Sequence, residues 1–355
     1  MQSAYTMATL ARSRRHVNQV SALNRTKTKF HADTGRLDGP WPGLYVTCAQ
    51  YARAVSCRRA ALSEEDSMYG HDLRWSLKTV QRRWSFQDTL TLWKIAEEYG
   101  FHAVYLNDHL YGDTLESWTM LAAMFSRTET VRGGTLVTSN SFRHPAILAK
   151  MTATVDVISG GRLIVGLGAG NEAAEYHAYG LDFPPPGERV RRLEESCQVL
   201  EAAWSGQPST MSGRFYSLRD ATFAPRPVQD PRPHLLLGVK GDRALRVAVR
   251  HADEWNWNRG HAPTREFLKR NARLDELCAE MGRDPASLPR GLGYRRLLAQ
   301  IEAGEETFEA AVADARDCVR GGASQIVLML GAPERQRAEI DFYRSTFIPA
   351  VREGL

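Results

Sequence analysis

The residues best suited to chemistry in this sequence follow short apolar segments. Asn107, Asp108 and His109 come directly after the apolar segment 102–106. An imidazole accepts or donates a proton near neutral pH, and a neighbouring carboxylate, from Asp108 or another acid, can fix which ring nitrogen carries the proton. His109 and Asp108 are therefore predicted to be catalytic, in acid–base chemistry. The alternative for His109 is a structural hydrogen-bonding role.

A glycine-rich turn follows another apolar segment, 162–167. Its glycines occupy alternate positions, Gly166, Gly168 and Gly170, and Asn171 and Glu172 come next. Such glycines allow a positive φ and let a ligand approach the backbone closely. A dinucleotide-binding turn would need a third glycine at position 171, where Asn stands. The turn is therefore either a ligand loop of another kind or a plain connection between a strand and a helix.

The segment Gly238-Val-Lys-Gly-Asp-Arg243 is the best candidate for binding a phosphate. It offers backbone N–H groups at the start of a predicted helix, with Lys240 and Arg243 close by in the sequence. Helix starts of this kind attract anions because their first N–H groups have no partner within the helix. The alternative is an ordinary capped helix with a solvated lysine.

Strands and helices alternate along the rest of the chain. Eight apolar segments are typical of strands, each followed by a helical pattern: 73–80, 102–106, 133–138, 162–167, 234–239, 254–257, 291–298 and 325–330. Such alternation implies parallel pairing with right-handed crossovers. The predicted fold class is α/β, a single (β/α)8 TIM barrel, with a doubly wound open sheet as the alternative.

In a barrel, the loops after the strands gather at the carboxyl end and form the site. The histidine, the glycine turn and the phosphate candidate would all meet there. Aldol or hydrolytic chemistry would need a central lysine or a metal cluster at the strand ends. Neither is visible in the sequence, so no metal site is predicted.

Charge is concentrated at the front of the chain. Residues 1–67 carry ten Lys or Arg and five acidic residues, which accounts for the whole formal net charge of +5. The remainder is neutral, which argues against nucleic acid as a partner. The front segment has no clear periodicity, and we expect a poorly structured N-terminal extension over 1–67, read from a start upstream of Met68, before a barrel domain over 68–355.

The apolar runs and the cysteines indicate the environment in which the protein works. No run of eighteen apolar residues exists, so no membrane association is predicted. The cysteines at 48, 57, 197, 278 and 318 form no Cys-x-x-Cys pair. This usage fits a reducing, cytoplasmic location.

Three joined motifs resemble the luciferase-like monooxygenase family over roughly residues 73–351. They are Gly134-Thr-Leu-Val-Thr-Ser-Asn-Ser-Phe-Arg-His-Pro, Asp156-Val-Ile-Ser-Gly-Gly-Arg-Leu-Ile-Val-Gly-Leu-Gly-Ala-Gly-Asn and Phe183-Pro-Pro-Pro-Gly-Glu-Arg. Asp108-His109 and Ala252-Asp-Glu-Trp-Asn also fit. The resemblance implies a (β/α)8 barrel that binds reduced FMN or the deazaflavin F420 at its carboxyl mouth.

The resemblance also implies roles for particular residues. His109 is similar to a histidine near the reacting ring, and Leu136 and Val137 fall near a non-proline cis peptide that bulges against the ring. Val239 and Lys240 depart from the glycines usual in the phosphate loop. The segment 298–305 is short compared with many relatives. The residues assigned to the cofactor are Leu136, Val137, Asn140, Gly168, Gly170, Asn171, Glu172, Gly238, Lys240, Gly241 and Arg243.

The function that the resemblance implies is hydride transfer between F420 and a small organic substrate, by a homodimeric oxidoreductase. An FMN-dependent monooxygenase is the alternative, because reduced FMN activates oxygen whereas deazaflavin does so poorly. A flavin-binding barrel that has lost catalysis is a further alternative. The identity of the substrate does not follow from the sequence.

Overall fold

The computed structural model describes residues 73–79, 83–110, 112–257, 264–294 and 297–355, together with two short strands nearer the N-terminus. These are β1 (Phe30–His31) and β2 (Arg36–Leu37), which pair antiparallel. The chain divides into two units, residues 1–62 and 63–355. Apart from β1 and β2, the expected extension over 1–67 lies outside the described residues, so its lack of structure and its boundary stay predictions.

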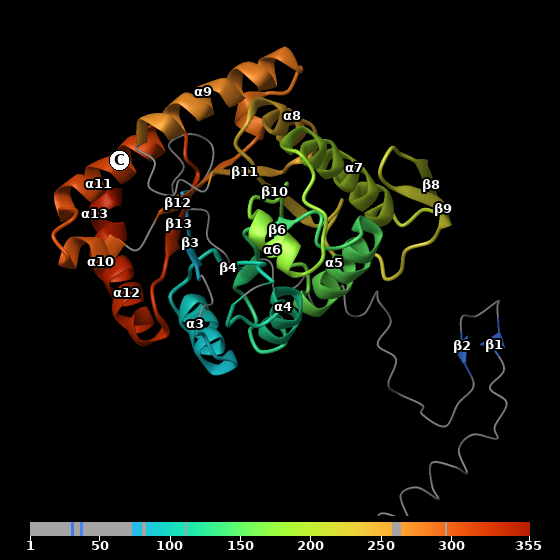
Figure 1. Cartoon of the computed structure of the whole chain (residues 1–355). Coiled ribbons are helices and arrows are strands. Elements are labelled where there is room, and N and C mark those ends of the chain that lie inside the picture. The colour runs from blue at the N-terminus through green and yellow to red at the C-terminus, as the bar shows by residue number, and fades with distance from the viewer. Residues whose placement is uncertain are drawn as a thin grey trace, which may run out of the picture. The chain divides into compact units, whose positions relative to one another are not determined.

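Eight parallel strands close into a barrel in the second unit (Figure 1). Each strand pairs with the next along the chain, and the last pairs with the first, so the sheet has no free edge. This closure confirms the predicted (β/α)8 barrel over the open sheet. The strands are β3 (Arg74–Lys78), β4 (Ala103–Leu106), β5 (Arg132–Thr135), β7 (Leu163–Gly168), β10 (His234–Gly238), β11 (Glu254–Trp257), β12 (Arg290–Tyr294) and β13 (Gln325–Met329).

Helices lie between successive strands and surround the barrel (Figure 1). Ser85 caps the first of them, since its Oγ accepts the N–H of Asp88 at 3.1 Å and Asp88 accepts the N–H of Ser85 at 2.9 Å. Pro145 occupies the first turn of another, where its missing N–H leaves no helical bond unmade. The helices are α3 (Phe86–Glu98), α4 (Ser117–Phe125), α5 (Pro145–Ser159), α6 (Ala173–Ala178), α7 (Pro186–Trp204), α8 (Asp242–His251), α9 (Thr264–Glu280), α10 (Leu297–Glu302), α11 (Phe308–Arg320), α12 (Gln336–Phe342) and α13 (Ile348–Arg352).

Two departures from the strand-and-helix alternation are visible. The segment after α7 contains a hairpin of β8 (Ser209–Ser212) and β9 (Ser217–Ala221). A short strand, β6 (Thr138–Ser139), continues the path of β5 and pairs with β7. The residues between β5 and β6, Leu136 and Val137, therefore bulge out of the ladder at the carboxyl end of the barrel.

The amino end of the barrel is closed by paired polar side chains. Glu254 is fully buried, 3.0 Å from Arg74 Nη2 and 3.4 Å from His234 Nε2. Burial alone would raise the pKa of Glu254, but Arg74 and His234 together lower it to about 2. Burial and the charge of Arg74 lower the pKa of His102 to about 3. Since this end is filled, a ligand is expected at the opposite end.

Candidate active site

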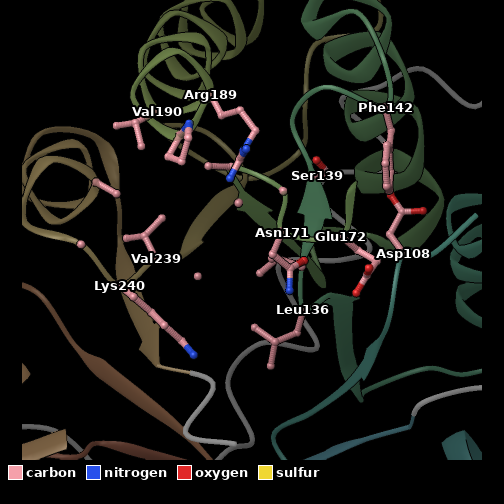
Figure 2. Close-up of a pocket in the computed structure, with 18 of the residues that line it drawn as sticks. Asp108, Leu136, Ser139, Phe142, Asn171, Glu172, Arg189, Val190, Val239 and Lys240 are labelled. Atoms are coloured by element: carbon pink, nitrogen blue, oxygen red, sulfur yellow. The ribbon is translucent and has the colours of Figure 1, made fainter. Parts of the chain in front are cut away.

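A cavity of about 680 Å³ opens at the carboxyl end of the barrel. Its size suits a small molecule or a cofactor ring. Figure 2 shows side chains from several strand ends and from α7 converging on it. The cavity brings together almost all the residues that the sequence predicted, namely Asp108, His109, Leu136, Val137, Gly168, Gly170, Asn171, Glu172, Gly238, Lys240, Gly241 and Arg243.

Leu136 and Val137 form an apolar wall of this cavity. The peptide bond between them is cis, as the family resemblance implied. The Val137 side chain lies between β7 and β10, because a Cβ on Gly168 would lie 2.7 Å from its Cγ2 and a Cβ on Gly238 would lie 2.8 Å from its Cγ1. The Val137 side chain therefore fits between the strands only because residues 168 and 238 are glycines without a Cβ. A flat ring can pack on the resulting surface.

His109 is bound by Glu175, not by its neighbour in the sequence. Its Nδ1 lies 3.0 Å from Glu175 Oε2, and the other carboxylate oxygen of Glu175 accepts the N–H of Leu110. Glu175 is only 2% exposed and lies on α6. A buried carboxylate at Nδ1 favours the tautomer that carries its proton there, and it stabilises the imidazolium when the ring is protonated.

Asp108 has different partners. Its carboxylate accepts two hydrogen bonds from Arg143, at 2.6 and 3.1 Å, and one from Thr138 Oγ1 at 2.8 Å. Asp108 lines the cavity but is 3% exposed. These bonds tie the end of β4 to β6 and to the start of the following loop. Asp108 is therefore placed to hold the backbone that carries His109, and the acid that fixes the imidazole is Glu175.

The start of α8 forms the positively charged part of the cavity. Its N-cap is Gly241, which has no side chain to cap the helix. A Cβ placed on Gly241 would have no atom within 4 Å, so the space beside it is open. Lys240 and Arg243 have no hydrogen-bond or ion-pair partner within the part of the chain that the structure describes. An anion here would meet open backbone N–H groups and two cations, which is the chemistry of a phosphate site.

Arg189, from the first turns of α7, faces this region from the other side. It donates to the carbonyl of Pro184 at 2.7 Å and stacks on the Phe183 ring at 3.9 Å. Figure 2 shows Arg189 and Lys240 reaching towards the cavity from α7 and from the end of β10. The two helix starts thus present cations to one ligand space.

The glycine turn after β7 follows the prediction in part. Gly170 has φ of +80°, and a Cβ there would lie 2.3 Å from Tyr176 Oη and 2.7 Å from Ser139 Oγ. Only glycine suits this position. Asn140, by contrast, does not line the cavity. With its amide oriented so that both polar atoms are satisfied, Asn140 donates to Gly168 O at 3.1 Å and accepts the N–H of Leu193 at 3.2 Å, a position that braces the glycine turn.

Several residues of the cavity were missed by the sequence interpretation. Lys78, 4% exposed, ends β3 and corrects the expectation that no central lysine exists at the strand ends. Asn256, the residue before the last one of β11, also lines the cavity. Lys78 is a charged residue at the end of a strand, which was a usable signal. Arg189 ends the motif Phe183-Pro-Pro-Pro-Gly-Glu-Arg, but no role was assigned to it, and Glu175 carried no signal because it lies in a short polar helical segment.

Comparison with known proteins identifies the class. Residues 69–346 match the luciferase-like monooxygenase family, and the chain belongs to it. An F420-dependent glucose-6-phosphate dehydrogenase of Microbacterium testaceum (strain StLB037) is 34% identical over 218 residues, which cover 59% of this chain and 64% of that protein. An FMNH(2)-dependent dimethylsulfone monooxygenase of Pseudomonas putida is 28% identical over 217 residues, 61% of this chain and 55% of that protein. The chain thus matches less than two thirds of the length of these relatives.

Solved structures agree with the fold. The F420-dependent tetrahydromethanopterin reductase of Methanopyrus kandleri has a TM-score of 0.67 at 18% identity, covering 78% of this chain and 99% of that one. An F420-dependent secondary alcohol dehydrogenase has a TM-score of 0.67 at 19% identity, covering 79% and 99%. At these identities the likeness supports the barrel alone.

The described residues lack membrane-spanning helices and clustered metal ligands. Among the helices that the structure describes, none is long and apolar enough to cross a membrane. The same residues contain no group of three or more His, Cys, Asp or Glu side chains arranged to hold a metal ion.

Proposed function

We propose that residues 68–355 form an F420-dependent oxidoreductase that transfers a hydride between the deazaflavin and a small organic substrate. The observation that carries the proposal is the arrangement of one cavity. An apolar wall, an oriented histidine and a cationic helix start all face it. Relatives named as F420-dependent dehydrogenases support the same cofactor.

The cavity fits the parts of this cofactor. Leu136 and Val137 would support the flat ring, and the open N–H groups of α8 with Lys240 and Arg243 would hold the phosphate. Gly168 and Gly170 would let the cofactor lie against the turn after β7. When bound, F420 supplies a carbon that accepts or releases a hydride.

His109 would move the proton that accompanies the hydride. Glu175 engages Nδ1, so proton exchange with a ligand falls to Nε2. In substrate oxidation, Nε2 takes the hydroxyl proton while Glu175 stabilises the imidazolium. In reduction, the same nitrogen returns the proton. Asp108 and Arg143 keep the strand end that carries His109 in place.

An FMN-dependent monooxygenase is the second candidate, because one relative carries such a name. The ring of FMN would suit the wall formed by Leu136 and Val137, and its phosphate would suit the start of α8. A barrel that binds flavin without catalysis is supported less, since the buried Glu175 still orients His109. Homodimer formation is proposed on the family resemblance only, and the cytoplasmic location stays a prediction.

The experiment is a hydride-transfer assay on the full chain with oxidised F420 and a panel of alcohols and sugar phosphates. Reduction of F420 should be observed with a member of the panel, and His109→Ala should abolish most of it. His177→Ala is the control, because His177 is exposed on the same helix as Glu175 and does not line the cavity. Equal loss in both variants would contradict the role of His109.

A further inference from the structure

Asn256 is a buried amide at the cavity without a hydrogen-bond partner. It is 1% exposed and lines the cavity, and neither Nδ2 nor Oδ1 has a hydrogen-bond partner. Leaving a buried polar group unpaired is unfavourable, so such groups in native proteins call for an explanation. A ligand in the cavity would provide one.

The position of Asn256 separates it from the apolar wall. It pairs with Gly238 of β10 and Gly291 of β12, and a Cβ on Gly291 would lie 2.4 Å from Asn256 Nδ2. The amide therefore extends over β12, away from Leu136 and Val137, which follow β5. Glycine at position 291 leaves the space that the amide uses.

Lys78 lies on the same side of the barrel mouth. It ends β3, which pairs with β13, and β13 pairs with β12. It lines the cavity and is 4% exposed. The run of strands from β11 through β12 and β13 to β3 thus carries one amide and one ammonium group. The run from β5 through β7 to β10 carries the wall and the phosphate candidate.

We propose that Asn256 and Lys78 bind the oxygen on the reacting carbon of the substrate, which makes the substrate an alcohol or a carbonyl compound. This inference rests on the proposed function. Asn256 Nδ2 and the Lys78 ammonium donate to that oxygen, and the positive charge stabilises it as it becomes negative. Asn256 Oδ1 is an acceptor that suits a second hydroxyl of the substrate.

The proposed step balances in both directions. In oxidation, the C–H bond of the alcohol breaks and its electron pair leaves as hydride to oxidised F420. The hydroxyl proton goes to His109, and the C=O bond forms. In reduction, the carbonyl carbon receives the hydride and the oxygen receives the proton. No further oxidant or reductant is needed.

The test compares three forms of the full chain with F420: the wild type, Asn256→Ala and the control Asn271→Ala. Asn271 is also a buried amide, but it lies on α9 and donates to Gly321 O at 2.7 Å. The probes are 2-propanol, cyclohexanol and glucose 6-phosphate. For the probe that the wild type oxidises, Asn256→Ala should lower kcat/KM by about 10- to 30-fold. F420 affinity should be unchanged, and Asn271→Ala should keep wild-type kcat/KM.

Other outcomes separate the hypotheses. If the wild type binds F420 but oxidises none of the probes, the substrate class is wrong and the proposed cofactor stands. If Asn256→Ala weakens F420 binding as much as turnover, Asn256 belongs to the cofactor site and the inference is overturned. Failure of the wild type to bind F420 would overturn the proposed function itself. If Asn256→Ala does not fold, Asn256→Ser replaces it, and thermal unfolding is measured to check that this variant is folded. Lys78→Met should lower kcat more than it raises KM.

Discussion

The replacement Glu175→Gln tests the His109–Glu175 pair at the centre of the mechanism. Gln keeps the shape of the side chain, and its amide oxygen can still accept the N–H of Leu110. The amide NH2 would then face His109 Nδ1, which lies 3.0 Å from Glu175 Oε2 in the native protein. Nδ1 would have to accept this hydrogen bond, so the ring proton would move to Nε2. Nε2 could then no longer act as a base.

The size of the effect follows from the lost charge. A hydrogen bond to a charged group contributes about 1.5–3 kcal/mol, which corresponds to about 10- to 150-fold in rate. In serine proteases, where the histidine is more enclosed, the comparable change costs about 10⁴ in kcat. The His109 side chain is 38% exposed, so water can replace part of the interaction. We therefore expect kcat/KM to fall by about 10- to 150-fold.

The assay is steady-state reduction of F420 by Glu175→Gln, with F420 affinity measured separately. Glu201→Gln is the matched control, since Glu201 lies 3.0 Å from His251 Nδ1 in a second His–Glu pair outside the cavity. Unchanged turnover in Glu175→Gln would refute the role given to this pair. So would an equal loss in both variants.

Three further predictions concern the rest of the barrel. The pKa of His102 is about 3 in the folded state against 6.5 in the unfolded chain, so the unfolded state takes up the proton first as the pH falls. Urea unfolding should show stability decreasing below about pH 6.5, by up to about 1.4 kcal/mol per pH unit from this group; a flat profile would contradict the assignment. Gly238→Ala should push Val137 into the cavity and weaken F420 binding, seen as a higher Kd in a fluorescence titration. Lys240→Ser with Arg243→Ser should weaken F420 binding and reduce its dependence on salt, whereas an unchanged salt dependence would argue against a phosphate at α8.

The barrel could be predicted because local signals agreed with one another. The eight apolar segments and the helical patterns between them each indicated an element in the right place. In a (β/α)8 barrel the loops that follow the strands meet at the carboxyl end. This property predicted that His109 and the segment 238–243 lie at the same end, although the sequence gives no distance between them. The observed strand order confirms the fold that these signals indicated.

The partners within the site could not be predicted in the same way. Glu175 is 66 positions from His109 in the sequence, and their contact depends on where the loop after β7 places α6. Asp108, next to His109, was the natural candidate, yet Arg143 and Thr138 bind its carboxylate. Asp108 and His109 lie in the loop that follows β4, where the path of the backbone sets the direction of each side chain, so neighbours in the sequence need not be neighbours in the site.

Asn140 illustrates the same limit. The family resemblance assigned it to the cofactor, but it does not line the cavity, and its amide is placed to bond Gly168 O and Leu193 N. Asn256, also at a strand end, faces the cavity. The sequence interpretation assigned Asn140 to the cofactor and gave Asn256 no role, and only the folded structure shows which of the two lines the cavity.

The most direct test of the central claim is a titration of the purified full chain with F420 and, separately, with FMN, followed by intrinsic tryptophan fluorescence. We expect saturable binding of F420 that is tighter than that of FMN and is weakened by Gly238→Ala. Binding of FMN alone would move the protein to oxygen chemistry. Binding of neither cofactor by a folded sample would contradict the account.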